Sequence, residues 1–83
     1  MNIQLTKHAI RDLDKIERAQ PRLYQAIVKK IETLANQPTL GKPLVGPLKG
    51  KWSLRVGDYR MLYEFSETRL VILTINHRRE VYK

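Results

Sequence analysis

The spacing of apolar residues changes once along this chain, and that change constrains the fold more than any other feature. Across residues 6–36 apolar residues recur every three or four positions, as on one face of a helix. From residue 52 onward they alternate with polar residues in WSLRV and YRMLYEF and then run almost continuously in LVILTI, as in strands. With short stretches at NIQL (2–5) and EVY (80–82), the pattern predicts the order β-α-α-β-β-β followed by a further short strand.

The helical part divides into two helices. Thr6 is suited to cap the first helix, which carries Ala9, Ile10, Leu13 and Ile16 on one stripe. Pro21 suits the first turn of the second helix, at about residues 20–36. We therefore expect a single α+β domain over residues 1–83, in which a two-helix hairpin packs on one face of a curved antiparallel sheet.

Residues 37–50 (QPTLGKPLVGPLKG) separate the helical part from the strands. Three prolines and three of the four glycines lie in this segment, so we expect no regular element there. Its apolar residues predict that the loop packs against the domain. They are Leu40, Leu44, Val45 and Leu48.

The composition favours a polyanionic partner. Lysine and arginine number 16 against 8 acidic residues, a net charge of +8, which suits a nucleic acid, a ribosome or an acidic protein. The simpler alternative is that the positive charge only keeps the protein soluble and serves no polyanionic partner. The absence of cysteine excludes disulfides and thiolate metal sites. No apolar run approaches the roughly 18 residues of a membrane span, and the N-terminus MNIQLTKHAIRD carries charge, so we expect a cytoplasmic protein with no membrane association.

A tight hairpin is predicted at Gly57-Asp58, a two-residue connection of the kind that closes such turns. It pairs Val56 with Tyr59 and places Trp52 opposite Tyr63 on the inner face of the sheet.

Cations gather on the other face of this hairpin. Arg55 lies directly opposite Arg60, and Lys51 shares their face. Like charges in such pairs repel. A bound anion would relieve the repulsion, and arginine is suited to forked contacts with phosphate. The alternative is that both side chains extend into water. A four-residue loop at 66–69 would place His77 on the same face as Arg60.

Two segments, LKGKWSLRVGDYRMLYEF and VILTINHRREVYK, resemble the RelE/ParE superfamily of toxins of bacterial and archaeal toxin–antitoxin systems. The resemblance covers nearly the whole chain. It implies a messenger-RNA endonuclease that acts in the ribosomal A site and is held inactive by a cognate antitoxin. Because the chain is strongly basic, we expect that antitoxin to be acidic.

The resemblance also implies the site residues. The catalytic positions of the RelE pattern match Lys51, Arg60, Arg78 and Tyr82. Further RNA-binding candidates are Arg55, His77 and Arg79. The second lysine of the RelE pattern falls on Ser53, and Arg55 is the residue that can supply the missing charge. No paired carboxylates, Ser-His-Asp set or metal-ligand spacing occur in the sequence, so we expect no cofactor and no metal.

Two classes of function remain open at this point. The match to the RelE catalytic positions favours the nuclease. The alternative is a non-catalytic protein, either a ParE-like gyrase inhibitor or a decayed toxin that retains only antitoxin binding.

Overall fold

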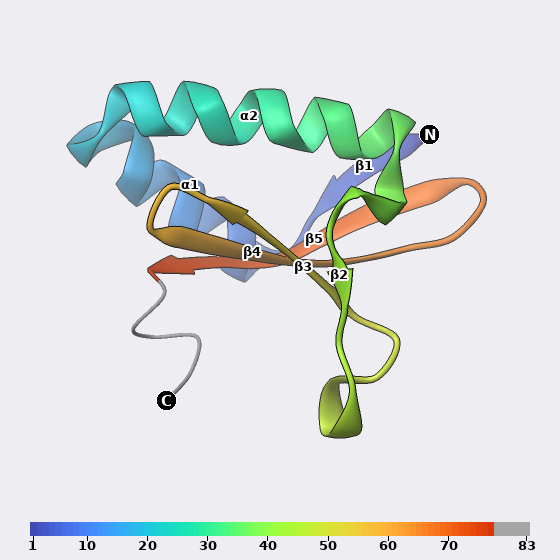
Figure 1. Ribbon diagram of the computed structural model, residues 1–83. Helices are drawn as coiled ribbons and strands as arrows, with labels where there is room; N and C mark the ends of the chain where they lie inside the picture. Colours follow the sequence, from blue (N-terminus) through green and yellow to red (C-terminus); the bar gives the residue numbers. More distant parts are fainter. Residues whose placement is uncertain (78–83) are drawn as a thin grey trace.

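The computed structural model describes residues 1–77, which form two helices over one face of a five-stranded sheet (Figure 1). The strand order across the sheet is β1-β5-β4-β3-β2. The helices are α1 (Lys7–Ala19) and α2 (Pro21–Asn36). The strands are β1 (Asn2–Leu5), β2 (Lys42–Pro43), β3 (Trp52–Val56), β4 (Tyr59–Phe65) and β5 (Arg69–His77). Two short 3₁₀ turns, η1 (Pro38–Leu40) and η2 (Gly46–Leu48), lie on either side of β2.

The α+β architecture with a helical hairpin on one face is confirmed, with two differences in the sheet. Strand β1 pairs parallel to β5, so the sheet is mixed and not purely antiparallel. Two helices and three strands separate β1 from β5 along the chain, so no tight turn forces them to be antiparallel. The additional short strand is β2, which lies inside the segment expected to be irregular, whereas the EVY segment lies outside the described residues.

The core lies between the helices and the sheet. Helix α1 contributes Ala9, Leu13 and Ile16 from the stripe that the sequence predicted. The prediction is wrong for Ile10, which was expected on the same stripe and is 53% exposed. The other buried apolar residues are Ile27, Ile31 and Leu34 of α2 and Val56, Met61, Tyr63, Leu70, Ile72 and Ile75 of the sheet. Because both helices cover the same face, no helix within residues 1–77 covers the opposite face of the sheet, which we call the open face (Figure 1).

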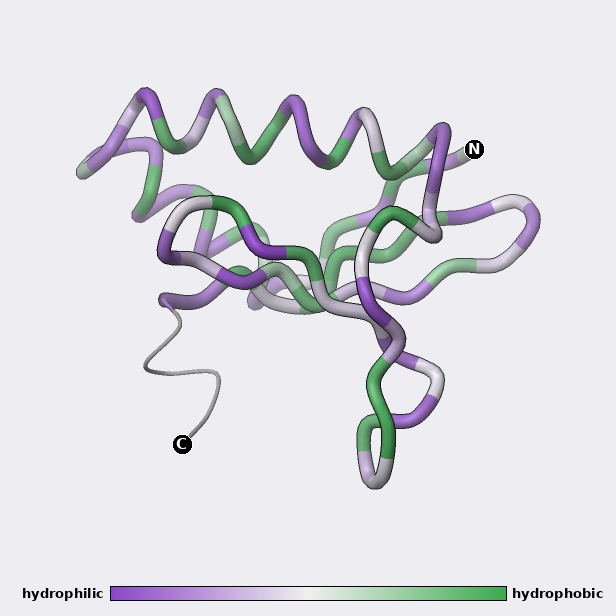
Figure 2. The backbone as a smooth tube through the Cα atoms, viewed as in Figure 1, coloured by the Kyte–Doolittle hydropathy of each residue, from purple (hydrophilic) through white to green (hydrophobic). Residues whose placement is uncertain are grey.

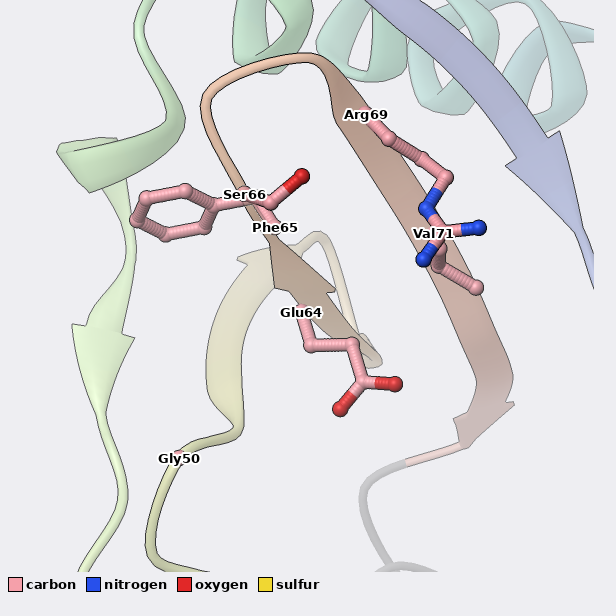
Figure 3. A pocket seen from close by; sticks show the side chains of 6 residues that line it. All are labelled: Gly50, Glu64, Phe65, Ser66, Arg69 and Val71. Atoms are coloured by element: carbon pink, nitrogen blue, oxygen red, sulfur yellow. The ribbon is translucent and has the colours of Figure 1, made fainter.

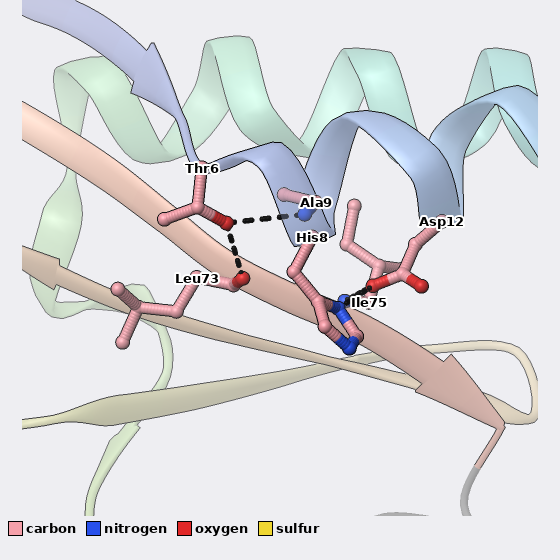
Figure 4. A network of polar contacts seen from close by, with 6 residues as sticks. All are labelled: Thr6, His8, Ala9, Asp12, Leu73 and Ile75. Carbon is pink, nitrogen blue, oxygen red and sulfur yellow. Dashed lines mark hydrogen bonds and ion pairs between the residues drawn. The ribbon is translucent and has the colours of Figure 1, made fainter.

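Thr6, which precedes α1, and Asp12 of α1 bind the edge of β5 beyond the point where β1 ends (Figure 4). The Thr6 hydroxyl accepts the Ala9 N–H at 3.1 Å as helix cap and donates to the Leu73 carbonyl at 2.6 Å. The Asp12 carboxylate accepts the Ile75 N–H at 2.9 Å. These bonds satisfy backbone groups that a neighbouring strand would otherwise pair. They fix the end of β5 relative to the helices.

Tyr63 anchors the loop at 37–50. Its ring is fully buried, and its hydroxyl donates to the Pro38 carbonyl at 2.7 Å and accepts the Gly41 N–H at 3.1 Å. Burial raises the pKa of Tyr63, and the hydrogen bond from Gly41 opposes that shift. A Cβ atom at residue 41 would lie 2.5 Å from both the Ser53 carbonyl oxygen and the Tyr63 hydroxyl, so only glycine fits this close approach.

The expected packing of the whole loop against the domain is wrong for its outer part. Val45 is 85% exposed, and Leu48 is also exposed. Leu40 is exposed as well, although it lies beside the anchored Gly41. Gly46 and Gly50 adopt positive φ angles of 66° and 94°. The chain between β2 and β3 turns back there in a tip that projects beyond the sheet (Figure 1). Figure 2 shows hydrophobic segments at this tip. The loop is held near Gly41 and at its pairing with β3, not at its tip.

Candidate functional site

The β3–β4 hairpin forms in the predicted register. Val56 pairs with Tyr59, and Arg55 lies opposite Arg60. Gly57 has a φ angle of 60°, the left-handed conformation that glycine adopts without strain, so the sequence closes the turn at the expected position. The prediction of two arginines facing each other across the ladder is confirmed.

Aromatic side chains occupy the helix-facing side of this hairpin, as predicted. Trp52 pairs with Tyr63, and their ring centroids lie 6.4 Å apart. Phe65 lies 5.3 Å from Trp52 and 6.3 Å from Tyr63 by the same measure. These rings pack with the core, so they do not form a stacking surface on the open face.

The two arginines on the open face lean in opposite directions. Arg60 is half-buried, and its Nη1 donates to the Ser53 hydroxyl at 3.4 Å, away from the turn. Arg55 is exposed, and its Nε donates to the Gly57 carbonyl at 2.8 Å, toward the turn. The divergence separates the two guanidinium groups and reduces the repulsion that the sequence predicted. Both groups remain on one face of the hairpin.

A hollow of about 290 Å³ lies beside these arginines, between the loop and the hairpin. It is lined by residues 40–42, residues 53–55 and Arg60. Three of these residues, Lys42, Arg55 and Arg60, are cationic, and none of the described lining residues is acidic. Such a hollow is suited to an anion. Sequence reasoning missed Lys42 because the two-residue strand that positions it lies among prolines and glycines; the signal was a lysine flanked by Gly41 and Pro43.

Lys51 precedes β3 and lies outside this hollow. Its backbone is held by the loop, since its carbonyl accepts the Leu44 N–H at 2.9 Å and its N–H donates to the Leu48 carbonyl at 3.0 Å. At about 3.3 Å per residue it lies about 13 Å along the chain from Arg55. Lys51 therefore contributes charge at the other end of the hairpin.

A second hollow, of about 190 Å³, lies at the far end of β4 and β5 (Figure 3). Glu64 extends from β4, and Arg69 and Val71 extend from β5. This hollow contains a carboxylate as well as a guanidinium, so its charges offset each other. It is less suited to phosphate than the hollow beside Arg60.

The expected position of His77 on the face of Arg60 is wrong. Arg60 pairs with Asn76, and His77 pairs with Tyr59, so the two pairs lie on opposite faces. The cause is an irregularity at Leu62/Tyr63, where β5 has one extra residue, Leu73. The extra residue reverses the alternation that a regular ladder would have. The His77 ring instead lies edge-on to Tyr59, with centroids 5.5 Å apart.

Three predicted site residues, Arg78, Arg79 and Tyr82, lie outside the described residues. Within residues 1–77 no group of three or more histidine, aspartate or glutamate side chains is arranged to hold a metal ion. No helix in the described part of the chain is long and apolar enough to cross a membrane.

Comparison with known proteins places the chain among toxins. Residues 3–82 match the model of the family described as the ParE toxin of type II toxin–antitoxin systems, parDE. Toxin RelG of Mycobacterium tuberculosis is 38% identical over 85 residues, which cover 98% of this chain and 94% of that protein.

Solved structures agree with this family. The toxin–antitoxin complex RelBE2 of M. tuberculosis contains a chain that superposes with a TM-score of 0.81 and 38% identity, covering 93% of this chain and 96% of that one. The YoeB/ParE toxin of Agrobacterium tumefaciens superposes with a TM-score of 0.83 and 25% identity, covering 93% of this chain and 98% of that one.

Proposed function

The chain belongs to the RelE/ParE superfamily of toxins of type II toxin–antitoxin systems, and we propose that it is a ribosome-dependent endonuclease that cleaves messenger RNA in the A site. The observation that carries the proposal is the cationic open face of the β3–β4 hairpin, with Arg55 and Arg60 beside a hollow that has no acidic residue among its described lining. Such a face is suited to the RNA backbone. Action on ribosomes implies that the protein works in the cytoplasm.

The proposed reaction uses the RNA's own 2′-OH as nucleophile. Its oxygen attacks the adjacent phosphorus, the bond to the 5′ oxygen breaks, and a 2′,3′-cyclic phosphate and a 5′-OH end form. The 2′-OH loses a proton and the leaving oxygen gains one, so the protein must orient the chain, move protons and stabilise the added negative charge. No step of this reaction requires a metal ion.

Named residues take these roles in the proposal. Arg60 stabilises the charge that develops on the phosphate, because its guanidinium lies on the open face beside the hollow. Lys51, at the other end of the hairpin, belongs to the same proposed catalytic set on the basis of the resemblance, and Arg55 binds the RNA backbone. Arg78 and Tyr82 complete the proposed catalytic set on the basis of the resemblance, with Tyr82 stacking on a base or moving a proton. His77 is left out of the RNA-facing surface because its ring packs against Tyr59.

Purified ribosomes carrying a defined message test this function. We expect the protein to produce new 5′-OH ends inside the codon held in the A site, and to leave the same RNA intact when ribosomes are omitted. The measurement is primer extension from the cleaved message. Intact messages in this assay, together with inhibited gyrase supercoiling, would favour the non-catalytic alternative.

The toxin has a cognate antitoxin as partner, and we propose that this partner is acidic and covers two apolar surfaces. Large exposed apolar residues occur on β1 and α1, where Ile3 is 41% and Ile10 is 53% exposed, and on the loop around Val45. Strand β1 also forms an edge of the sheet, so its outer backbone groups can pair with an added strand. The net charge of +8 favours an acidic chain at these surfaces.

Antitoxin binding should raise the melting temperature. At a free antitoxin concentration of about 100 times Kd the stabilisation is about 2.7 kcal/mol. For a domain of this size that corresponds to about 10–20 °C. Thermal melts with the acidic polypeptide encoded next to the toxin gene measure the shift. Ile3→Lys should reduce it, and Lys30→Ala on the outside of α2 serves as the control. The absence of any shift with such a polypeptide contradicts the proposed surface.

A further inference from the structure

Lys42 lies on the same face of the sheet as Arg60. Lys42 of β2 is the register partner of Ser53 in β3, and Ser53 is in turn the partner of Leu62 in β4. Directly paired residues project to the same face, with Cα atoms about 4.5–5.5 Å apart. The Arg60 guanidinium reaches the Ser53 hydroxyl from the side of β4, at 3.4 Å. Lys42 and Arg60 therefore flank Ser53 from two different strands.

The hollow between them combines two cations, the exposed Lys42 and the half-buried Arg60, with a buried hydroxyl. Ser53 is only 5% exposed, although it is polar and lies on the open face, because Arg60 and the loop at Gly41 cover it. The cations Lys42 and Arg60 line the hollow above it, with Arg55 at the side nearer the turn. Because Arg60 is half-buried, its charge interacts more strongly with an anion than a fully exposed charge would. An anion bound here would contact both cations.

The position of Lys42 is fixed by the neighbouring backbone. Gly41 donates its N–H to the buried Tyr63 hydroxyl, and residues 42 and 43 pair with β3. The ammonium group is thus carried on a backbone that is already held in place, which lowers the entropic cost of binding a ligand there. A lysine at the projecting tip of the same loop would not have this restraint.

We propose that this hollow is a phosphate subsite, in which Lys42 and Arg60 together bind one phosphate of the RNA chain. Arg60 provides planar, forked donors and Lys42 a compact charge, and the Ser53 hydroxyl can donate its proton to the same phosphate. Lys42 acts in positioning the RNA and takes no part in proton transfer. The subsite deepens the proposed nuclease function and rests on it for the identity of the polyanion.

A non-cleavable RNA trinucleotide with 2′-O-methyl groups is the probe for this subsite. Nuclear magnetic resonance titration of the full chain should shift the backbone amides of Lys42 and Ser53. Loss of one phosphate contact should reduce the slope of log K against log salt concentration by about 0.7 for single strands. Lys42→Ala should show this reduction, whereas Lys42→Arg should retain the slope. Lys30→Ala removes the same charge from the outside of α2 and should leave the slope unchanged.

Cleavage of messages on ribosomes, measured in parallel, separates this inference from the proposed function. Trinucleotide binding with a Lys42-dependent slope, but no cleavage by the native protein, supports the subsite and contradicts the nuclease. Cleavage by the native protein with an unchanged slope in Lys42→Ala overturns the subsite and leaves the nuclease standing. Failure of the native protein to bind the trinucleotide also overturns the subsite. A slope reduced equally in Lys42→Ala and Lys30→Ala overturns it as well, since the effect is then one of total charge.

Discussion

Replacing Arg60 with alanine is expected to slow messenger-RNA cleavage by about 10²–10³, or about 3–4 kcal/mol, as for the loss of one preorganised donor to a transition state. Arg60 lies on the open face, opposite Arg55, so its removal also relieves repulsion between like charges. The fold should therefore survive. The test measures two quantities on the same preparation of each variant. They are the cleavage rate on programmed ribosomes and the melting temperature.

One further variant distinguishes geometry from charge at residue 60, and a second serves as a control elsewhere on the surface. Arg60→Lys keeps the positive charge and loses the forked guanidinium, so it should restore part of the activity. Arg11→Ala removes an exposed arginine from α1, on the covered side of the sheet, and should cleave at the native rate. Near-normal cleavage by Arg60→Ala, or loss of cleavage only in proportion to unfolding, would exclude Arg60 from the site.

The register of the hairpin could be predicted from the sequence because its determinants are local. A glycine in the left-handed conformation and strict alternation on both sides leave one way to pair β3 with β4. The same local rules identified Thr6 as the cap of α1 and named the three apolar residues that α1 buries, but they also assigned the exposed Ile10 to the buried stripe. The facing arginines followed directly from that register.

The parts that the sequence did not predict depend on contacts between distant segments. The bulge at Leu73 reversed the expected face of His77, and bulges carry no single-residue signature. The parallel pairing of β1 with β5 joins residues separated by most of the chain. Lys42 was missed for the same reason, since its face is set by pairing with Ser53 and by the contact of Gly41 with Tyr63.

Tyr63→Ala is expected to have the largest effect on stability of any single change in the described core, about 3–5 kcal/mol. Alternation along the strands predicts that Trp52 and Tyr63 both face the interior. In the structure Tyr63 is fully buried and Trp52 is only half-buried. Small domains have total stabilities of about 5–15 kcal/mol, so the loss removes a large part of the total. Chemical denaturation at neutral pH measures it. A loss below 1 kcal/mol would contradict the anchoring role of the ring.

Tyr63→Phe separates the hydroxyl from the ring. The ring remains, but the Pro38 carbonyl and the Gly41 N–H lose their partner, which should cost about 1–3 kcal/mol. Tyr59→Phe is the control, because the Tyr59 hydroxyl accepts one exposed hydrogen bond from Gln20 at 3.3 Å, and its loss should cost well under 1 kcal/mol.

The stability difference between the native protein and Tyr63→Phe should depend on pH, and this dependence tests the buried hydroxyl directly. Burial raises the pKa of Tyr63, so the folded state holds the hydroxyl proton more tightly than the unfolded chain does. The contribution of this proton to the free energy of unfolding is fully present below the ordinary tyrosine pKa of about 10. It is lost as the pH rises through the higher pKa of the folded state. The stability difference between the native protein and Tyr63→Phe should therefore shrink above about pH 10, while lysine titration affects both proteins alike. A constant difference across this range would show that the hydroxyl is not the group that holds the loop, and the position of Lys42 would then need another cause.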